Sequence, residues 1–163
     1  MKMKSIQYNI DMAYIQSDDT SKDLGYQLKS LKMAEEIHGS KPHPHIAILY
    51  SNVGATYMQL KVSEKGVDYR FKSIKMLEEI LGDEKHPLLA NSYSNIVGAN
   101  NALDQLEKGL EYLFKSLAIR DEIFKNKAHP DLAITYFNIG DACSQVKDWS
   151  NMLDSYFKRA RMT

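Results

Sequence analysis

Cysteine is almost absent from this sequence, because the 163 residues contain only Cys143. A single cysteine cannot form an internal disulfide, which excludes a disulfide-stapled secreted scaffold and makes a reducing, cytoplasmic location the expectation. Long apolar runs are absent as well. No stretch approaches the roughly 20 residues that a membrane span requires, and the start shows no apolar region of signal-peptide length. We therefore expect neither membrane insertion nor secretion.

The chain has no net charge, since 21 lysines and arginines balance 21 aspartates and glutamates. Such a chain has no overall field with which to attract nucleic acid or an anionic membrane surface. Proline and glycine are scarce too, with four and eight copies, and helix-forming residues dominate the segments between them. An all-helical fold is therefore favoured over one built on a sheet.

A repeat is the most prominent feature that the sequence does contain. The dipeptide His-Pro begins at His43, His86 and His129, so that successive copies are 43 residues apart. A fixed period of this size is typical of solenoids. The same offset aligns further apolar columns, among them Ile10, Val53, Ile96 and Ile139, and also Leu28, Phe71, Phe114 and Phe157. The first copy therefore begins at the N-terminus, without its His-Pro.

Each unit reads as two helices. Apolar columns at i, i+4 and i+7 predict a helix over about residues 64–81 in the second copy. The first half of a unit follows its proline, which suits the first helical position, and Gly39 and Gly82 can end the preceding helices with positive φ. One pair cannot bury its apolar stripe alone, so neighbouring pairs must stack. We expect one all-α domain, residues 1–163, of four antiparallel pairs and eight helices, with repeats at about 1–42, 43–85, 86–128 and 129–163.

These units resemble tetratricopeptide repeats (TPR). The resemblance rests on Asn52-Val53-Gly54 followed by Tyr57, on Asn138-Ile139-Gly140, and on small residues in the second helices at Gly66 and Gly109. The long unit and its His-Pro-x-x-Ala opening are similar to the kinesin light chain type. The resemblance implies a right-handed superhelix whose concave groove binds proteins.

Four positions depart from the family pattern. Val97 stands in place of a glycine in the third copy, and Asn100 and Cys143 replace the aromatic residue of the first two copies. Arg70 occupies a position that is usually aromatic in the second helix. We expect local packing to differ at these positions.

The resemblance also implies where a partner binds, because first helices line the groove in this family and their asparagines often contact the backbone of a bound peptide. Asparagine is a poor mid-helix residue, since its amide competes for backbone hydrogen bonds, so a column of four needs a reason. The alternative reason is that each amide bonds a neighbouring helix and holds the stack. The asparagines are Asn9, Asn52, Asn95 and Asn138, and the flanking groove positions are Ser51, Ala55, Met58, Asn91, Ser94, Gly98, Asn101, Phe137 and Asp141.

None of the flanking positions is basic, whereas the carboxylate-binding and acidic-peptide grooves of this family use lysine and arginine. A neutral or mixed peptide is therefore expected, and RNA binding is not. A further column, Tyr50, Tyr93 and Tyr136, is interpreted as packing between helices, with interface anchoring as the alternative.

Catalytic and metal-binding patterns are not found. His38, His43 and His45 are close in sequence but have no companion cysteine or carboxylate cluster at metal-ligand spacing, so the His-Pro histidines are interpreted as helix-start residues. Cys143 falls on a packing column inside a predicted helix, which indicates a buried, inert thiol. We expect no enzyme activity, no metal and no other cofactor.

The sequence thus predicts a cytoplasmic adaptor or scaffold module that binds a protein or peptide partner in its groove. The alternative is a sensory or autoinhibitory domain of a larger protein. A solenoid end normally carries a polar cap, yet the last predicted helix presents Leu153, Tyr156, Phe157 and Ala160. Self-association through that helix is another way to cover it.

Overall fold

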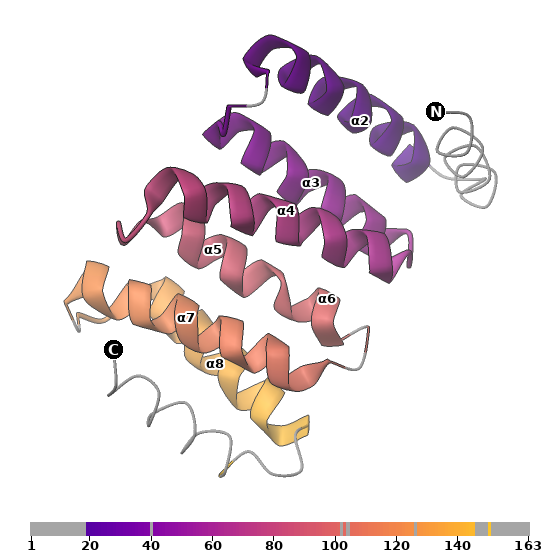
Figure 1. Cartoon of the computed structure of the whole chain (residues 1–163). Helices are drawn as coiled ribbons and strands as arrows, with labels where there is room; N and C mark the ends of the chain where they lie inside the picture. Colours follow the sequence, from indigo (N-terminus) through magenta and orange to yellow (C-terminus); the bar gives the residue numbers. More distant parts are fainter. Residues whose placement is uncertain are drawn as a thin grey trace. The chain divides into compact units, whose positions relative to one another are not determined.

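The structure, a computed structural model, describes residues 19–39, 41–101, 103, 105–125, 127–145 and 150. Seven α-helices and no strand lie within these residues (Figure 1). They are α2 (Asp19–His38), α3 (Pro44–Gln59), α4 (Ser63–Leu81), α5 (Pro87–Asn95), α6 (Val97–Asn101), α7 (Leu106–Phe124) and α8 (Pro130–Gln145). The all-α prediction is confirmed, while the eight helices and the superhelix stay predictions. None of the described helices is both long and apolar enough to cross a membrane.

The chain divides into two compact units, Met1–Ser73 and Ile74–Thr163, and the boundary falls inside α4. The first unit contains α2, α3 and the beginning of α4. The second contains the end of α4 and α5 to α8. The single domain over residues 1–163 stays a prediction.

In the first unit, α2 lies beside α3 (Figure 1). The Thr56 hydroxyl lies 3.2 Å from the Asn52 carbonyl oxygen, one turn back, and 2.9 Å from Oε1 of Gln27 in α2. This buried hydroxyl therefore links the two helices and costs little to bury. Helix α3 also approaches α4 closely, because a Cβ on Gly54 would lie only 3.0 Å from the carbonyl oxygen of Gly66. A glycine at position 54 is what permits that approach.

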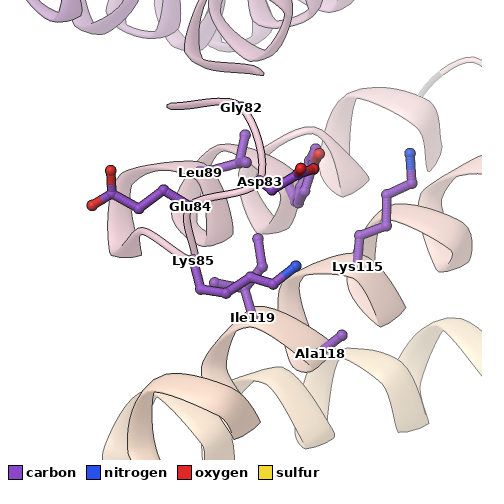
Figure 2. Close-up of a pocket in the computed structure, with 9 residues that line it drawn as sticks. Gly82, Asp83, Glu84, Lys85, Leu89, Lys115, Ala118 and Ile119 are labelled. Atoms are coloured by element: carbon purple, nitrogen blue, oxygen red, sulfur yellow. The ribbon is translucent and has the colours of Figure 1, made fainter. Parts of the chain in front are cut away.

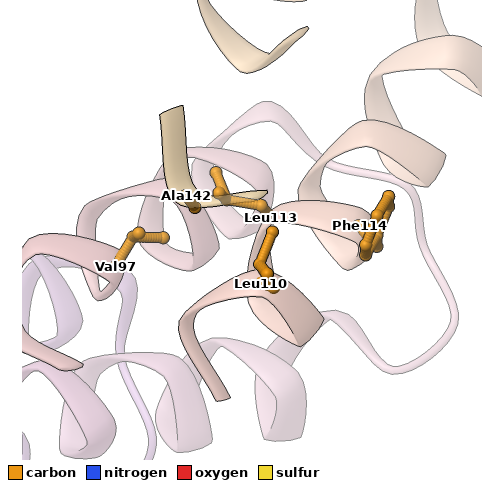
Figure 3. Close-up of a cluster of buried hydrophobic side chains, with 5 residues drawn as sticks. All are labelled: Val97, Leu110, Leu113, Phe114 and Ala142. Atoms are coloured by element: carbon orange, nitrogen blue, oxygen red, sulfur yellow. The ribbon is translucent and has the colours of Figure 1, made fainter. Parts of the chain in front are cut away.

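In the second unit, α7 packs against α5, α6 and α8. Figure 3 shows the buried cluster that joins them, in which Leu110, Leu113 and Phe114 of α7 meet Val97 of α6 and Ala142 of α8. Ile139 and Cys143 pack against its edge. Phe114 of this cluster and Ile139 at its edge belong to the apolar columns of the repeat, whereas Val97 takes the place of Gly54 and Leu113 that of Arg70.

The helix boundaries follow the His-Pro and glycine signals. α3, α5 and α8 begin at Pro44, Pro87 and Pro130. Before each proline, Nδ1 of the histidine accepts a hydrogen bond from the backbone N–H two residues on, at 3.2 Å for His43, 3.1 Å for His86 and 3.2 Å for His129. The imidazole therefore acts as a helix N-cap in all three places. The helix-start interpretation is confirmed.

Two further boundary predictions hold. The helix expected over about residues 64–81 is α4, and Gly39 and Gly82 follow α2 and α4 with φ of 65° and 55°. Glycine reaches this left-handed region without steric cost.

The first helix of the third copy is interrupted, although the repeat predicted one continuous helix there. α5 ends at Asn95, and α6 resumes at Val97. Val97 holds the position of Gly54, where the second copy has room only for a hydrogen atom, and its side chain packs into the buried cluster instead. The interruption is the single residue Ile96, whose backbone stays in the right-handed helical region. Four residues on, Asn100 is fully buried, and neither polar atom of its side chain has a hydrogen-bond partner among the described residues.

Candidate functional site

The predicted binding residues of the second unit lie on α5 and α8, the first helices of the third and fourth copies. Their exposed and half-buried members define what we call the α5–α8 surface. It consists of Asn91, Ser94 and Asn95 of α5 and Phe137, Asn138 and Asp141 of α8.

A buried arginine of α7 holds the two sides of this surface together. Arg120 Nη2 donates to Oδ1 of Asn91 at 2.7 Å, and Nη1 donates to Oγ of Ser94 at 3.1 Å, both in α5. Nη1 also donates to Oγ1 of Thr135 and to the Asp131 carbonyl oxygen, both in α8. One side chain thus fixes α5 and α8 relative to each other.

Arg120 places a positive charge under a surface that the sequence predicted to be uncharged. Its side chain is 7% exposed, and its acceptors among the described residues are neutral oxygens. Burial lowers the pKa of this guanidinium, an effect that the negative charge of Asp131 opposes, and an arginine stays protonated at neutral pH. Arg120 was not among the predicted site residues. The signal in the sequence is its place in a column with two apolar residues, Ala34 and Leu77, which the structure shows to be buried.

The amides of this surface differ in their surroundings. Asn91 and Asn95 are exposed, and Asn138 is half-buried. Ser94 is half-buried and is a structural partner, since its hydroxyl lies 2.8 Å from that of Ser116, which in turn donates to the Ala90 carbonyl oxygen. Asn91 therefore combines an exposed position with a hydrogen bond inside the fold, whereas Ser94 serves mainly the packing of α5 on α7.

Two other members of the surface lie on the exposed side of α8. Phe137 is 74% exposed. Asp141 is exposed as well, and its carboxylate accepts a hydrogen bond from Nε2 of Gln145 at 3.1 Å. The surface therefore offers a large apolar ring, a carboxylate and several amides to a partner.

The remaining predicted residues lie elsewhere. In the first unit, Asn52 of α3 is exposed and Ser51 is half-buried. Asn9 lies outside the described residues, and so does the side chain of Asn101, whose backbone belongs to α6. Whether these asparagines bind a partner stays a prediction.

The tyrosine column packs between helices in two of its three places. The hydroxyl of Tyr50 donates to Oε1 of Glu35 at 2.7 Å, and 43 residues later Tyr93 donates to Oε1 of Glu78 at 2.7 Å. Burial and the hydrogen bond to the carboxylate raise the pKa of both tyrosines. Packing is confirmed for Tyr50 and Tyr93, while Tyr136 is 55% exposed.

A separate hollow of the second unit contains none of the predicted binding residues (Figure 2). It is lined by residues 82–85, by Leu89 and Tyr93 of α5, and by Lys115, Ala118 and Ile119 of α7. Lys115 lies over the rings of Tyr93 and Tyr112, with Nζ 5.5 and 5.1 Å from their centroids. The Lys115 side chain at this hollow is thus held by aromatic packing.

Reactive groups are few in the part of the chain that the structure describes. No group of three histidine, cysteine, aspartate or glutamate side chains there could hold a metal ion. Cys143 is half-buried, and burial raises the pKa of its thiol, so the nucleophilic thiolate is scarce at neutral pH.

Comparison with known proteins supports the fold. No protein-family model and no curated protein matches the sequence. The chain is similar in structure to a solved protein titled "Crystal structure of BtubC (BKLC) from P. vanneervenii", with a TM-score of 0.70 and 19% sequence identity. The match covers 88% of this chain and 58% of that one, so this chain spans less than two thirds of its neighbour's length. This likeness shows a TPR-like helical-repeat fold.

Proposed function

We propose that this chain is a protein-interaction module whose first helices bind an extended or helical segment of a partner protein. The observation that carries the proposal is the α5–α8 surface, where Asn91 and Asn95 of α5 are exposed on one helix and Asn138 and Phe137 belong to the next first helix. Arg120 bridges the two helices, so the surface is ordered before a partner arrives. A preordered surface binds with a smaller loss of conformational entropy.

The finer parts of the proposal rest on the sequence. The chain is of the kinesin light chain-like TPR type, its four helix pairs form a right-handed superhelix, and its role is cytoplasmic and non-catalytic. Exposed amides suit a partner's backbone, because each amide offers both a donor and an acceptor without selecting for side-chain charge. The alternative role, as a regulatory part of a larger protein, stays a prediction.

Replacement of Asn52, Asn95 and Asn138 by alanine tests the proposal. A quantitative pulldown with the wild-type chain first identifies the partner, and the triple variant should then bind it at least about tenfold more weakly, because each lost hydrogen bond contributes about 0.5–1.5 kcal/mol. The melting temperature should hold or rise slightly, since alanine is the better helix former.

A matched control replaces two exposed residues that are not among the predicted binding residues, Gln59 of α3 and Lys75 of α4, by alanine. This control should bind as the wild type does. A fall in the melting temperature of the asparagine variant, with binding unchanged, would show instead that the amides hold the helices together.

A further inference from the structure

Two polar residues of the third copy occupy positions that are apolar in the other described copies. They are Arg120 of α7 and Asn91 of α5. Their counterparts in the 43-residue register are Leu77 and Ala34 for the arginine, and Ile48 and Ile134 for the asparagine. The first two are buried, and the last two are 42% and 56% exposed. The helical repeat therefore forms without polar residues at either position, so folding alone does not explain this pair.

The hydrogen bond between the two side chains fixes the direction of the Asn91 amide. A guanidinium group has donors and no acceptor, so it can bind an amide only through the amide oxygen. Nη2 of Arg120 donates to Oδ1 of Asn91 at 2.7 Å. The NH₂ group on the other branch of the amide is left to donate elsewhere, and it has no acceptor among the described residues. Because Asn91 is exposed, the surface presents a hydrogen-bond donor whose direction is set before a partner binds.

The arginine also places a positive charge behind that donor. Its acceptors within the described part of the chain are an amide oxygen, two hydroxyl oxygens and a backbone carbonyl oxygen, and all are neutral. The carboxylate of Asp131, whose charge acts on Arg120 from α8, lies 3.9 Å from Nδ1 of His129 on a side chain that is 45% exposed. A buried charge without an anion in contact is unfavourable. An anionic group brought by a partner therefore lowers the energy of this arginine.

The chemistry of Asn91 differs from that of an ordinary exposed asparagine. An asparagine whose oxygen is unoccupied can turn either its donor or its acceptor towards a peptide backbone. Asn91 offers its donor, because Arg120 occupies the oxygen. The group that matches it on a partner is an acceptor. A negatively charged acceptor matches better than a neutral one, because hydrogen bonds to an ionised group are shorter and roughly twice as strong.

We propose that Arg120 is a positioning residue of the partner-binding surface: through Asn91 it selects a segment that places an acidic side chain at this point. The inference rests on the proposed function, because it concerns the segment bound there. The carboxylate of the partner accepts the Asn91 N–H, while the guanidinium stays buried behind the amide. Polarisation along this chain of hydrogen bonds strengthens each of them. The neutral or mixed peptide expected from the sequence thus becomes a segment with at least one acid.

Peptides selected from a displayed random library on the full-length wild-type chain test the charge preference. The selected sequences should share an aspartate or glutamate at one recurring position. Replacement of that residue by asparagine or glutamine should weaken binding to the wild type about tenfold, measured by fluorescence anisotropy at fixed ionic strength. With Arg120→Met the same replacement should change the affinity less than about twofold, because the charge behind Asn91 is gone.

Asn91→Asp distinguishes recognition from a merely structural role of the pair. The new carboxylate can still accept from Nη2 of Arg120 and forms an ion pair with it, so the stability in urea should equal or exceed that of the wild type. The N–H donor is lost, however, and the charge of the arginine is neutralised. The preference for the acidic peptide should therefore disappear in a variant that folds normally. Gln59→Glu makes the same amide-to-acid exchange at an exposed residue of α3, and it should retain the preference.

The outcomes separate this inference from the proposed function. Peptides that bind the wild type without a recurring acid would overturn the role of Arg120 and leave the proposed function standing. An acid preference that persists in both Arg120→Met and Asn91→Asp would do the same. A wild-type chain that selects no peptide from the library would contradict the proposed function itself, and this inference with it.

Discussion

Arg120 ties two helices of the second unit together. It donates to Asn91 and Ser94 on one helix and to Thr135 and the Asp131 carbonyl on another. Such a side chain is costly to truncate, because Ser94 and Thr135 would lose a hydrogen bond while they stay half-buried and buried. The apolar residues Ala34 and Leu77 at the counterpart positions show that the fold itself does not require a charge there.

Substitution of Arg120 separates these two effects. Arg120→Ala should lower the free energy of unfolding by about 2–4 kcal/mol, because it leaves a cavity and unpaired hydroxyl and amide groups. Arg120→Met should cost less, since a side chain of similar length fills most of the cavity and the lost hydrogen bonds remain the main cost. Urea denaturation measures both values. Equal losses in the two variants would show that the hydrogen bonds, and not the packing, dominate.

At the residue scale, the sequence predicted some side-chain contacts and not others. The columns of Tyr50 and Tyr93 predicted packing correctly, because a regular period repeats the geometry of a contact. The same period could not reveal Arg120 as a bridge, since a hydrogen-bond network depends on three helices meeting in space and each member occurs once. The carboxylate partners Glu35 and Glu78 are also 43 residues apart, but the period alone does not show that they accept from tyrosines in a different helix.

At the scale of helices, the close packing of α3 on α4 depends on Gly54, whereas its counterpart Gly140 in α8 has no such close neighbour. A Cβ at Gly54 would lie 2.8 Å from Cγ of Arg70 and 3.0 Å from the backbone oxygen of Gly66, whereas one at Gly140 would meet nothing within 4 Å. Backbone cannot move aside as a side-chain tip can. The two glycines of one column therefore have different costs of replacement.

Gly54→Ala should thus destabilise the protein by about 1–3 kcal/mol, as other overpacked sites do. Gly140→Ala should be neutral or stabilise it by up to about 1 kcal/mol through helix propensity. Urea denaturation of the two variants side by side gives the comparison. Similar effects of both substitutions would mean that α3 and α4 are not in close contact.

The start of α3 responds to pH through its histidine cap, His43. Nδ1 of His43 can accept the His45 N–H only while it is unprotonated, and burial, followed by the charges of His38 and His45, lowers the pKa of His43. A lowered folded-state pKa gives a stabilisation that is complete above the ordinary value of about 6.5 and is lost as the pH falls through the folded value. Acid should therefore weaken this cap.

His43→Asn keeps a capping acceptor that does not titrate. Between about pH 7 and pH 5, the melting temperature of the wild type should fall further than that of the variant. Thermal melts followed by circular dichroism at the two pH values measure the difference. Parallel curves would contradict a titrating cap at His43.

At the scale of the whole chain, the 43-residue period predicted most of the helix boundaries, because proline and glycine signals are local and act wherever they occur. It did not predict the interruption at Ile96 in the third copy, between α5 and α6. Val97 replaces a glycine in this copy. Such a substitution changes packing against a neighbouring helix, and the period of the sequence does not describe that packing. The TPR-like fold is supported by the similarity to BtubC over 88% of this chain.

The binding residues could be predicted only in part from the sequence. Residue type and register located Asn91, Asn95 and Asn138 on first helices, and the structure places them there. Their function depends on a partner, and the columns of the repeat do not indicate the chemistry of that partner. The charge that Arg120 supplies beneath them came from the structure alone.

The central claim is that Asn52, Asn95 and Asn138 bind the partner. The side-chain amide signals of a chain of 18.7 kDa can be followed directly by NMR. The partner retained in the pulldown is titrated into the labelled protein, and the side-chain NH₂ resonances of its asparagines are observed. We predict that those of Asn52, Asn95 and Asn138 shift together and saturate with the partner. Saturable binding that leaves these three signals unmoved would contradict the account.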